Sequence, residues 1–250
     1  MVFTSLEKNK NLYEVVAVVE NKIGRRNKFQ EIFNLPQNRV FENLDDFFKV
    51  EKIAHAVIIS SIDNTHYDAA VKSLKKGYNV LVEGPVANSL DKLVNLENIC
   101  EENKDKIFMA AMPYRYSSFF KKLKNIIESK ELGQLININY NSYIGYDKFA
   151  HKYVRGNWRL DSDTAPIFLT NSCYDLDMLE YLTNSTCEKV SSFGELNYAD
   201  IICRNGDGHG LYKINESGSG TVDRAEGYGS NPRDGGQMPE WYIWGRTKFK

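Results

Sequence analysis

The sequence predicts an α/β fold with a parallel sheet, followed by a curtailed α+β domain with antiparallel strands. Short β-branched runs alternate with longer amphipathic stretches from Tyr13 to Ala111, which is typical of parallel strands joined by crossover helices. Beyond Pro113 apolar and polar residues alternate singly, as they do in half-exposed antiparallel strands. Apolar periodicity then fades, and more than half of the 17 glycines fall at or after Gly206.

The first part contains the parallel sheet. The run from His55 to Ser61 is apolar on both faces, as expected of a central strand that helices cover on both sides. The helix from Thr65 to Lys76 stops at Gly77, a favourable C-cap. The expected strands are Tyr13–Glu20, Arg39–Phe41, His55–Ser61, Tyr78–Pro85 and Ile107–Ala111, and the expected helices are Gly24–Asn34, Leu44–Val50, Thr65–Lys76 and Leu90–Glu102.

The second part is shorter and less regular. We expect a helix at Tyr116–Ser129, an antiparallel strand at Gln134–Tyr146, a helix at Ser172–Leu182 and a strand at Lys189–Leu196. The Gly-rich end shows no pattern of a packed layer and favours a poorly ordered tail. The expected organisation is therefore a partial parallel-sheet domain at residues 1–113, a partial α/β domain at 114–204 and the tail at 205–250.

Composition narrows the function classes. Lys and Arg number 32 and Asp and Glu 33, so a formal net charge of -1 provides no field that would attract nucleic acid or an anionic membrane. No apolar run is long enough to span a bilayer. The four cysteines show no metal-binding spacing and indicate reduced thiols. We expect a cytoplasmic protein that has no metal and binds a small molecule.

The parallel sheet is of Rossmann type but lacks its first strand. A Rossmann unit binds pyrophosphate on a glycine loop that opens its first helix, and an acid about 20 residues later binds the ribose. Counting back from Glu20, which ends a strand, places that loop at Met1, and no such loop opens this chain. Thr4–Lys10 is then a remnant of the first helix. A solvated strand-end carboxylate is an equally supported reading of Glu20.

Several motifs resemble one family. They are EVVAVVE, AVIISSIDNTHYDAAVKSLKKGYNVLVEGPVA, the pair Arg115–Tyr116, LGQL, HKYVRGNWR and CYDLDML. Together they resemble the Gfo/Idh/MocA oxidoreductases, in register over roughly Leu12–Leu196. The resemblance implies a Rossmann domain, a second α/β domain whose sheet serves substrate binding and often homo-oligomer contact, and hydride transfer between NAD or NADP and a sugar, polyol or related hydroxyl compound.

The resemblance also implies site residues. It places the turn after the central strand and the Glu-x-Pro turn beside the cofactor, and the HKYVRGNWR loop, with His151 and Arg155, near cofactor and substrate. The implied cofactor-binding residues are Glu20, Ser60, Ile62, Asn64, His66, Glu83 and Pro85, and the implied substrate-binding residues are Trp158 and Arg159. The alternative reading of His66 is a residue that packs or caps a helix start. The alternative reading of Arg159 is a loop arginine in a salt bridge.

Two proton-handling positions depart from the family pattern. The family's Glu-Lys-Pro lysine is matched by Gly84, and its acid/base histidine is matched by Tyr174, while Asp177 three residues later is retained. Tyr174 and Asp177 are therefore the candidate catalytic residues, and an aromatic side chain that packs against the helix is the alternative reading of Tyr174. A positioned acid or base is worth about a hundred- to ten-thousandfold in rate. The phenol of Tyr174 has an ordinary pKa of about 10, so it needs a nearby cation to transfer a proton at neutral pH.

The expected function is thus an oxidoreductase of this type, impaired in this copy. The alternatives are a non-catalytic relative that binds a nucleotide or a partner protein, and a gene fragment without activity. The choice between NAD and NADP stays open, because Glu20 favours a free ribose diol whereas Arg25 and Arg26 suit a phosphate.

Overall fold

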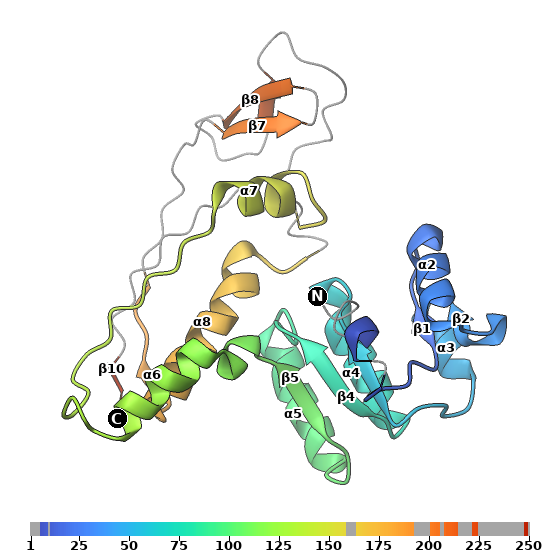
Figure 1. Cartoon of the computed structure of the whole chain (residues 1–250), viewed down its shortest axis with the longest axis horizontal. Coiled ribbons are helices and arrows are strands. Elements are labelled where there is room, and N and C mark those ends of the chain that lie inside the picture. Colours follow the sequence, from blue (N-terminus) through green and yellow to red (C-terminus); the bar gives the residue numbers. More distant parts are fainter. Residues whose placement is uncertain are drawn as a thin grey trace. The chain divides into compact units, whose positions relative to one another are not determined.

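The computed structural model describes residues 6–9, 11–158, 164–192, 201–205, 208–214, 222–224 and 248–249. The chain divides into two compact units, Met1–Ala111 and Met112–Lys250, and many of their elements are labelled in Figure 1. Arg159 and most of the Gly-rich end, for which the sequence predicted roles, lie outside the described residues.

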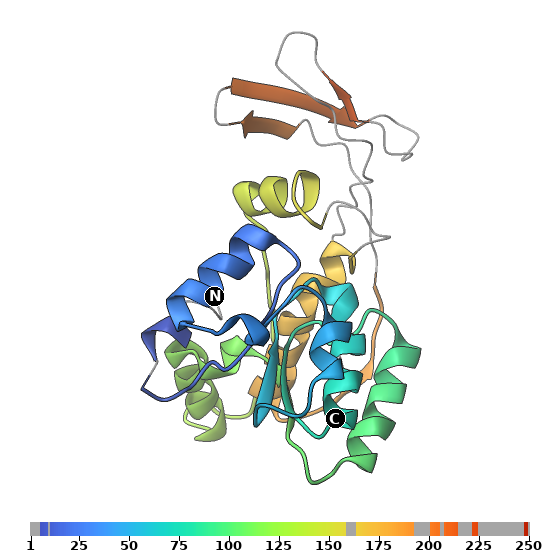
Figure 2. The same ribbon diagram turned by 90° about the vertical axis from the view of Figure 1, so that its right-hand side faces the viewer.

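The core of the first unit is a three-stranded parallel sheet in the order β3-β4-β5, made of Ala56–Ile59, Asn79–Glu83 and Phe108–Ala111. Helices α4 (His66–Lys75) and α5 (Leu90–Glu102) lie on the same face of this sheet (Figure 2). Their side chains bury the alternate strand residues on that face. The buried cluster is Ile59, Ala69, Ala70, Leu74, Val80, Val82, Leu96 and Ile99.

The opposite face of the same sheet is open within this unit. Ile58 of β3 is 40% exposed and Met109 of β5 is 39% exposed, although both belong to apolar strands. Parallel sheets are ordinarily covered on both faces. The expectation that helices cover both sides of β3 is therefore met on one side only among the described residues.

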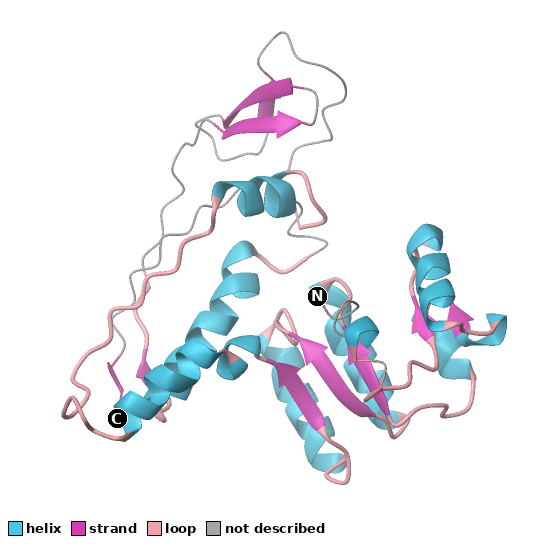
Figure 3. Cartoon of the chain, in the orientation of Figure 1, coloured by secondary structure: helices cyan, strands magenta, loops and turns pink. Residues whose placement is uncertain are grey.

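The remaining strands of the unit form a separate parallel pair, β1 (Val18–Val19) with β2 (Val40–Phe41). The two groups of parallel strands are drawn apart in Figure 3. In a Rossmann sheet the first strand lies between the second and the fourth strands of the chain. A pair followed by a separate three-stranded sheet is what remains when that strand is left out, so the predicted fold class is confirmed.

A short helix joins the two groups of strands. Helix α3 (Leu44–Lys49) starts at Asn43, whose side chain accepts a hydrogen bond from the Asp46 N–H at 2.9 Å. Its Phe47 is buried, with ring centroids 5.5 Å from Phe41 of β2 and 5.8 Å from Tyr78, which precedes β4. Further helical segments of this unit are α2 (Ile23–Phe33), η1 (Gln37–Arg39) and η2 (Asp63–Thr65).

The second unit is built around helix α8 (Ile167–Thr183), which packs with α6 (Ser118–Glu128) and η3 (Pro113–Tyr116). Helix α8 begins earlier than the predicted Ser172, directly after Pro166, and ends at Asn184 in the left-handed region. Further segments are α7 (Tyr146–Phe149), the π-helical η4 (Ala150–Val154) and β6 (Cys187–Lys189).

Two expectations for this unit differ from the structure. The stretch Gln134–Tyr146 was expected as a strand, but residues 134–145 form neither strand nor helix, and Ile136 and Tyr143 are each 87% exposed. An alternating pattern makes a strand only where a neighbour completes its hydrogen-bond ladder. Conversely, an antiparallel sheet forms at the Gly-rich end from β7 (Ile201–Asn205), β8 (Gly208–Ile214) and β9 (Val222–Arg224), and β10 (Lys248–Phe249) pairs with β6.

Candidate cofactor and active site

The predicted cofactor-binding turns gather at one edge of the parallel sheet. Strands β3 and β4 are parallel, with Ile59 beside Val82, so their carboxyl ends meet at the same edge. The turn containing Ser60, Ile62 and Asn64 leaves β3 there, and the Glu83–Pro85 turn leaves β4. Ser60 is exposed and Ile62 and Asn64 are partly buried. The structure therefore brings these sequence-predicted residues together.

His66 ties the two turns to each other. Its imidazole is 2% exposed, with Nδ1 2.8 Å from the Pro85 carbonyl oxygen and Nε2 3.0 Å from the Ser61 carbonyl oxygen. Both ring nitrogens thus face backbone acceptors, one in each turn. The side chain sets the spacing of the turns, and a direct contact of His66 with a cofactor stays a prediction.

Hydroxyl groups brace the turn that follows β3. Thr65 donates through Oγ1 to the Ile62 carbonyl at 2.7 Å, and the Ser61 and Thr65 hydroxyl oxygens are 2.6 Å apart. Because the Thr65 hydrogen is used on Ile62, Ser61 is the donor to Thr65. These two hydrogen bonds brace the backbone around Ile62.

Glu20 lies at the carboxyl end of β1, where its N–H donates to the Phe41 carbonyl at 3.0 Å. Its Oε1 accepts from the Lys22 N–H at 2.8 Å, at the start of α2. The Arg26 side chain is only 14% exposed, and its Nη1 donates to the Glu20 and Asn21 carbonyls at 2.6 and 3.2 Å. Arg26 is therefore engaged within the protein, and Glu20 supplies the negative charge at this strand end.

The candidate catalytic residues lie on α8 of the second unit. Asp177 accepts a two-pronged ion pair from Arg115, with Nε and Nη2 at 2.9 and 2.7 Å from its two carboxylate oxygens. Hydrogen bonding to Asp177 raises the pKa of Arg115 above its usual range. Tyr174, one turn earlier on the helix, packs beside Tyr114 with ring centroids 6.0 Å apart. Asp177 thus links η3 to α8, and a catalytic role for it stays a prediction.

A buried chain of hydroxyl and amide groups was missed from the sequence. Asn171 Nδ2 donates to Tyr153 Oη at 2.6 Å, Tyr153 Oη lies 2.7 Å from Thr170 Oγ1, and Thr170 Oγ1 donates to the Ile167 carbonyl at 3.1 Å. Lys148 completes the group by donating to Asn171 Oδ1 at 3.0 Å. The polar pair Thr170–Asn171 inside an otherwise apolar helix start was the available signal, since buried polar groups require partners.

The aromatic loop after η4 carries the remaining candidates. Lys152 Nζ lies 4.4 Å from the centroid of the Trp158 ring, and the backbone N–H of Trp158 donates to the Lys152 carbonyl at 3.3 Å. His151 is 3.2 Å from Arg155 Nη2 through Nδ1. These contacts hold Trp158 against its own loop, while Arg159 lies outside the described residues.

The described part of the chain contains neither a metal-binding cluster nor a membrane-spanning helix. No group of three His, Cys, Asp or Glu side chains there is arranged to hold a metal ion. Likewise, none of the helices in that part is long and apolar enough to cross a membrane.

Comparison with protein families gives two matches. Residues 2–111 match the oxidoreductase family with an NAD-binding Rossmann fold, and residues 120–227 match the GFO/IDH/MocA C-terminal domain. The second match continues well past Leu196, where the resemblance in the sequence was expected to end. The Gly-rich stretch up to residue 227 is therefore related to the family.

Individual relatives agree with this assignment. Glucose-6-phosphate 3-dehydrogenase of Bacillus subtilis is 28% identical over 73% of this chain and 50% of its own length. The structure of scyllo-inositol dehydrogenase from Lactobacillus casei with bound NAD(H) and scyllo-inositol has a TM-score of 0.68 at 18% identity, over 78% of this chain and 56% of that one. For myo-inositol 2-dehydrogenase from Lactobacillus plantarum the TM-score is 0.67 at 15% identity, over 77% and 55%.

The chain spans about half the length of the curated relatives it matches. Within that span both of the family's domains are matched, the Rossmann domain and the C-terminal domain. The chain belongs to the Gfo/Idh/MocA family of oxidoreductases, and its first unit is the family's NAD-binding Rossmann domain.

Proposed function

We propose that this protein binds NAD at the carboxyl edge of its parallel strands and takes part in hydride transfer to or from a sugar- or polyol-like hydroxyl compound. The observation that carries the proposal is the pair of turns after β3 and β4, fixed to each other by His66 within a unit of the NAD-binding family. Rossmann sheets bind dinucleotides at this edge.

NAD is favoured over NADP by the charges at the end of β1. A ribose diol donates hydrogen bonds to a carboxylate such as Glu20, whereas a 2′-phosphate would be repelled by it. Arg26, which could offset that repulsion, is held by the backbone carbonyls of Glu20 and Asn21. Arg25 is exposed and is the one nearby arginine side chain, among those described, with no such engagement.

The substrate class follows from the relatives, whose names specify inositol and glucose-6-phosphate as substrates. Both are ring compounds with several hydroxyl groups. We assign their recognition in this protein to Trp158, whose flat ring suits the apolar face of such a ring, and to Arg159, whose guanidinium suits a hydroxyl or an acidic group.

The chemical step is expected to be slow in this chain. Gly84 has no side chain with which to orient a hydroxyl group or move a proton, and Tyr174 replaces the histidine. When bound, NAD supplies the hydride acceptor, so what this chain lacks is proton transfer. A loss of one such group costs about a hundred- to ten-thousandfold. Gly84 therefore favours a second candidate function, nucleotide binding without turnover.

The proposal is tested first by calorimetric titration of the purified chain with NADH and NADPH. We expect micromolar binding of NADH and weaker binding of NADPH. Glu20→Gln should narrow that difference, whereas Glu42→Gln, which removes an exposed partner of Arg26 3.5 Å away, should leave it unchanged. A folded chain that binds neither dinucleotide would overturn the proposal.

A second experiment separates an impaired enzyme from a non-catalytic relative. The double variant Gly84→Lys, Tyr174→His restores the family pattern at both positions. If the protein is an enzyme with damaged chemistry, turnover of inositols or hexose phosphates with NAD should rise by at least about a hundredfold. Unchanged turnover with intact NADH binding would support binding without catalysis.

We also propose a cytoplasmic location and self-association through the second unit. Cys100, Cys173 and Cys187 are free thiols, as is usual in a reducing compartment. The exposed apolar side chains of Ile136 and Tyr143 provide a surface that a second copy could cover. Light scattering of the purified chain with and without Ile136→Asp tests the self-association.

A further inference from the structure

We propose that the hydroxyl compound on which this protein acts carries an anionic group, a phosphate or a carboxylate, which is bound by Lys152 and by the indole N–H of Trp158. This inference rests on the proposed function and deepens it, since it specifies the charge of the substrate. Both residues belong to the segment that runs from η4 to Trp158 in the second unit.

The indole N–H of Trp158 is the first observation. It is shielded from water and has no hydrogen-bond acceptor among the described residues. Buried polar groups in native proteins nearly always have a partner, and an unpaired buried donor destabilises the fold. An indole nitrogen donates and never accepts. The partner that this group requires is therefore an acceptor, and the oxygen atoms of an anion are the strongest acceptors.

The charge of Lys152 is the second observation. Its Nζ lies 4.4 Å from the centroid of the Trp158 ring and 5.1 Å from that of the Tyr153 ring. None of the ion pairs between described residues includes Lys152. The faces of aromatic rings attract a cation but do not neutralise it. Lys152 therefore keeps its positive charge for a ligand.

The two donors lie close enough to share one ligand. The indole nitrogen belongs to the ring over which Lys152 Nζ lies. Hydrogen bonds from an ammonium group and from an indole N–H are each about 3 Å long. A phosphate or carboxylate at the edge of the Trp158 ring can therefore accept from both donors, whereas a single hydroxyl group offers no charge to the ammonium.

The backbone of the segment fixes this arrangement. A Cβ atom on Gly156 would lie 2.4 Å from the His151 carbonyl oxygen and 2.5 Å from the Lys152 carbonyl oxygen, so the chain can turn back on η4 here only with glycine. The backbone N–H of Trp158 closes the turn on Lys152 at 3.3 Å. Tyr153 is 6% exposed and is held on α8 by the hydroxyl chain. Both donors are thus preorganised before a ligand arrives.

The charges around the two donors also favour an anion. Residues 146–158 contain three permanent cations, Lys148, Lys152 and Arg155, and a single carboxylate, Asp147. A local excess of one sign attracts ligands of the opposite sign. The segment therefore attracts an anion although the whole chain has almost no net charge.

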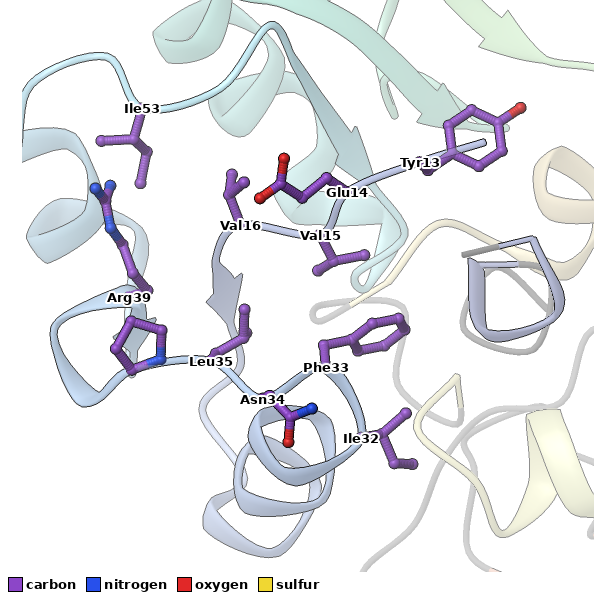
Figure 4. A pocket seen from close by; sticks show the side chains of 11 residues that line it. Tyr13, Glu14, Val15, Val16, Ile32, Phe33, Asn34, Leu35, Arg39 and Ile53 are labelled. Atoms are coloured by element: carbon purple, nitrogen blue, oxygen red, sulfur yellow. The ribbon is translucent and has the colours of Figure 1, made fainter. Parts of the chain in front are cut away.

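The hollow in the first unit is a poorer place for an anion. It has a volume of about 490 Å³ and a mainly apolar lining that includes Val15, Val16 and Leu35 (Figure 4). Its charged lining residues are Glu14 and Arg39, whose opposite charges leave no net positive field. Arg39 therefore provides a control for the site at Trp158.

The test follows the indole N–H resonance of Trp158 in ¹H–¹⁵N correlation spectra of the full chain without NAD. The chain has three tryptophans, and Trp158→Phe identifies the resonance by its loss. The ligands are glucose 6-phosphate, glucuronate and glucose at constant ionic strength. We expect both anions to shift the resonance and to bind about tenfold or more tightly than glucose, and the tighter anion distinguishes phosphate from carboxylate. No shift with either anion, or equal affinity for glucose, would overturn the proposal.

Matched variants locate the anion. Lys152→Gln should weaken binding of the anions about tenfold or more and leave glucose unaffected, whereas Lys152→Arg, which keeps the charge, should restore most of the affinity. Lys121→Gln removes another lysine of the second unit that lies over a ring, 5.6 Å from the Tyr116 centroid, and should have no effect. Arg39→Gln should have none either. Loss of anion binding in one of these two controls, with normal binding by Lys152→Gln, would contradict the proposal.

Titration of the same samples with NADH separates this inference from the proposed function. Binding of NADH together with Lys152-dependent binding of the anions supports both. Lys152-dependent anion binding without NADH binding supports the anion site and contradicts the NAD site. Binding of NADH without any preference for the anions over glucose contradicts this inference and leaves the proposed function standing.

Discussion

The turn edge of the first unit and helix α8 of the second unit are organised differently. At the edge, His66 reaches two backbone carbonyls and sets the geometry of both turns from inside the protein. On α8, side chains pair with side chains, and Asp177 is held by Arg115. The two turns are therefore fixed to each other through backbone groups, whereas the two candidate residues on α8 contact the side chains of η3, Tyr174 beside Tyr114 and Asp177 with Arg115.

The largest effect is expected from removing His66. His66→Ala removes the imidazole that lies between the Pro85 and Ser61 carbonyls and opens a cavity, so we expect the first unit to lose about 2–4 kcal/mol of unfolding free energy. NADH affinity should fall with it. The measurement is urea unfolding followed by hydrogen exchange in the first unit.

A neighbouring variant controls for a general effect of substitution on α4. Tyr67→Phe removes an exposed hydrogen bond to Asn95 and should cost only a few tenths of a kcal/mol. If His66→Ala were as mild as Tyr67→Phe, His66 would not be what holds the turns together.

On the second unit the corresponding change is Asp177→Asn. The Asp177 side chain is 14% exposed and Arg115 is 42% exposed, so the loss should be about 1–3 kcal/mol, below the 3–5 kcal/mol typical of a fully buried pair. Urea unfolding monitored by tryptophan fluorescence gives the value. In a double-mutant cycle with Arg115→Met, most of the stability lost in Asp177→Asn should appear as coupling energy between the two residues.

Glu128→Gln provides the matched surface control. It breaks the Lys124–Glu128 pair, in which the Glu128 side chain is 55% exposed, and should cost less than about 0.5 kcal/mol. Independent, additive losses for Asp177 and Arg115 would mean that their pairing does not hold η3 to α8.

A smaller effect is expected from the hydroxyl chain. Tyr153→Phe removes the group that joins Asn171 to Thr170 and should destabilise the second unit by about 1–2 kcal/mol. Because η4 leads to the Trp158 loop, the emission of Trp158 should also shift. Tyr143→Phe, at a residue 87% exposed, should change neither, and a shift in both variants would mean that the emission does not report on this network.

Much of the fold could be predicted from the sequence because βα units have a strong local pattern. Apolar runs that alternate with amphipathic stretches predicted every described strand of the first unit, and the count back from Glu20 predicted the gap that separates β1 from β3. The strands predicted from these runs also placed Glu20 and Glu83 at strand carboxyl ends, where the structure has them.

What could not be predicted depends on long-range partners. Gln134–Tyr146 has the alternation of a strand, but pairing is decided by a neighbour that the pattern does not specify. The role of His66 depends on the Pro85 carbonyl, 19 residues away, and that of Tyr153 on Thr170, 17 residues away. Such contacts are fixed by tertiary structure and leave no periodic signal.

The smallest effect concerns ionisation in the second unit. Burial, followed by the nearby carboxylate of Asp175, raises the pKa of Tyr140 to about 12, and Tyr140 Oη donates to Asp175 Oδ1 at 3.1 Å. A raised pKa means that folding favours the neutral phenol. The contribution of Tyr140 to the free energy of unfolding is fully present below about pH 10, the pKa of tyrosine in the unfolded chain. This contribution is lost as the pH rises through about 12.

Ultraviolet titration at alkaline pH, compared with Tyr140→Phe, isolates this group from the other tyrosines. Asp175→Asn should shift its ionisation toward lower pH, because the like charge is removed, but not fully to the ordinary value, because burial contributes more than Asp175 does. If Tyr140 ionises at the ordinary tyrosine pKa in the wild-type chain, it is not packed against Asp175 on α8. The second unit would then lack the Tyr140–Asp175 hydrogen bond next to Tyr174, and α8 would be less firmly held than the turns of the first unit.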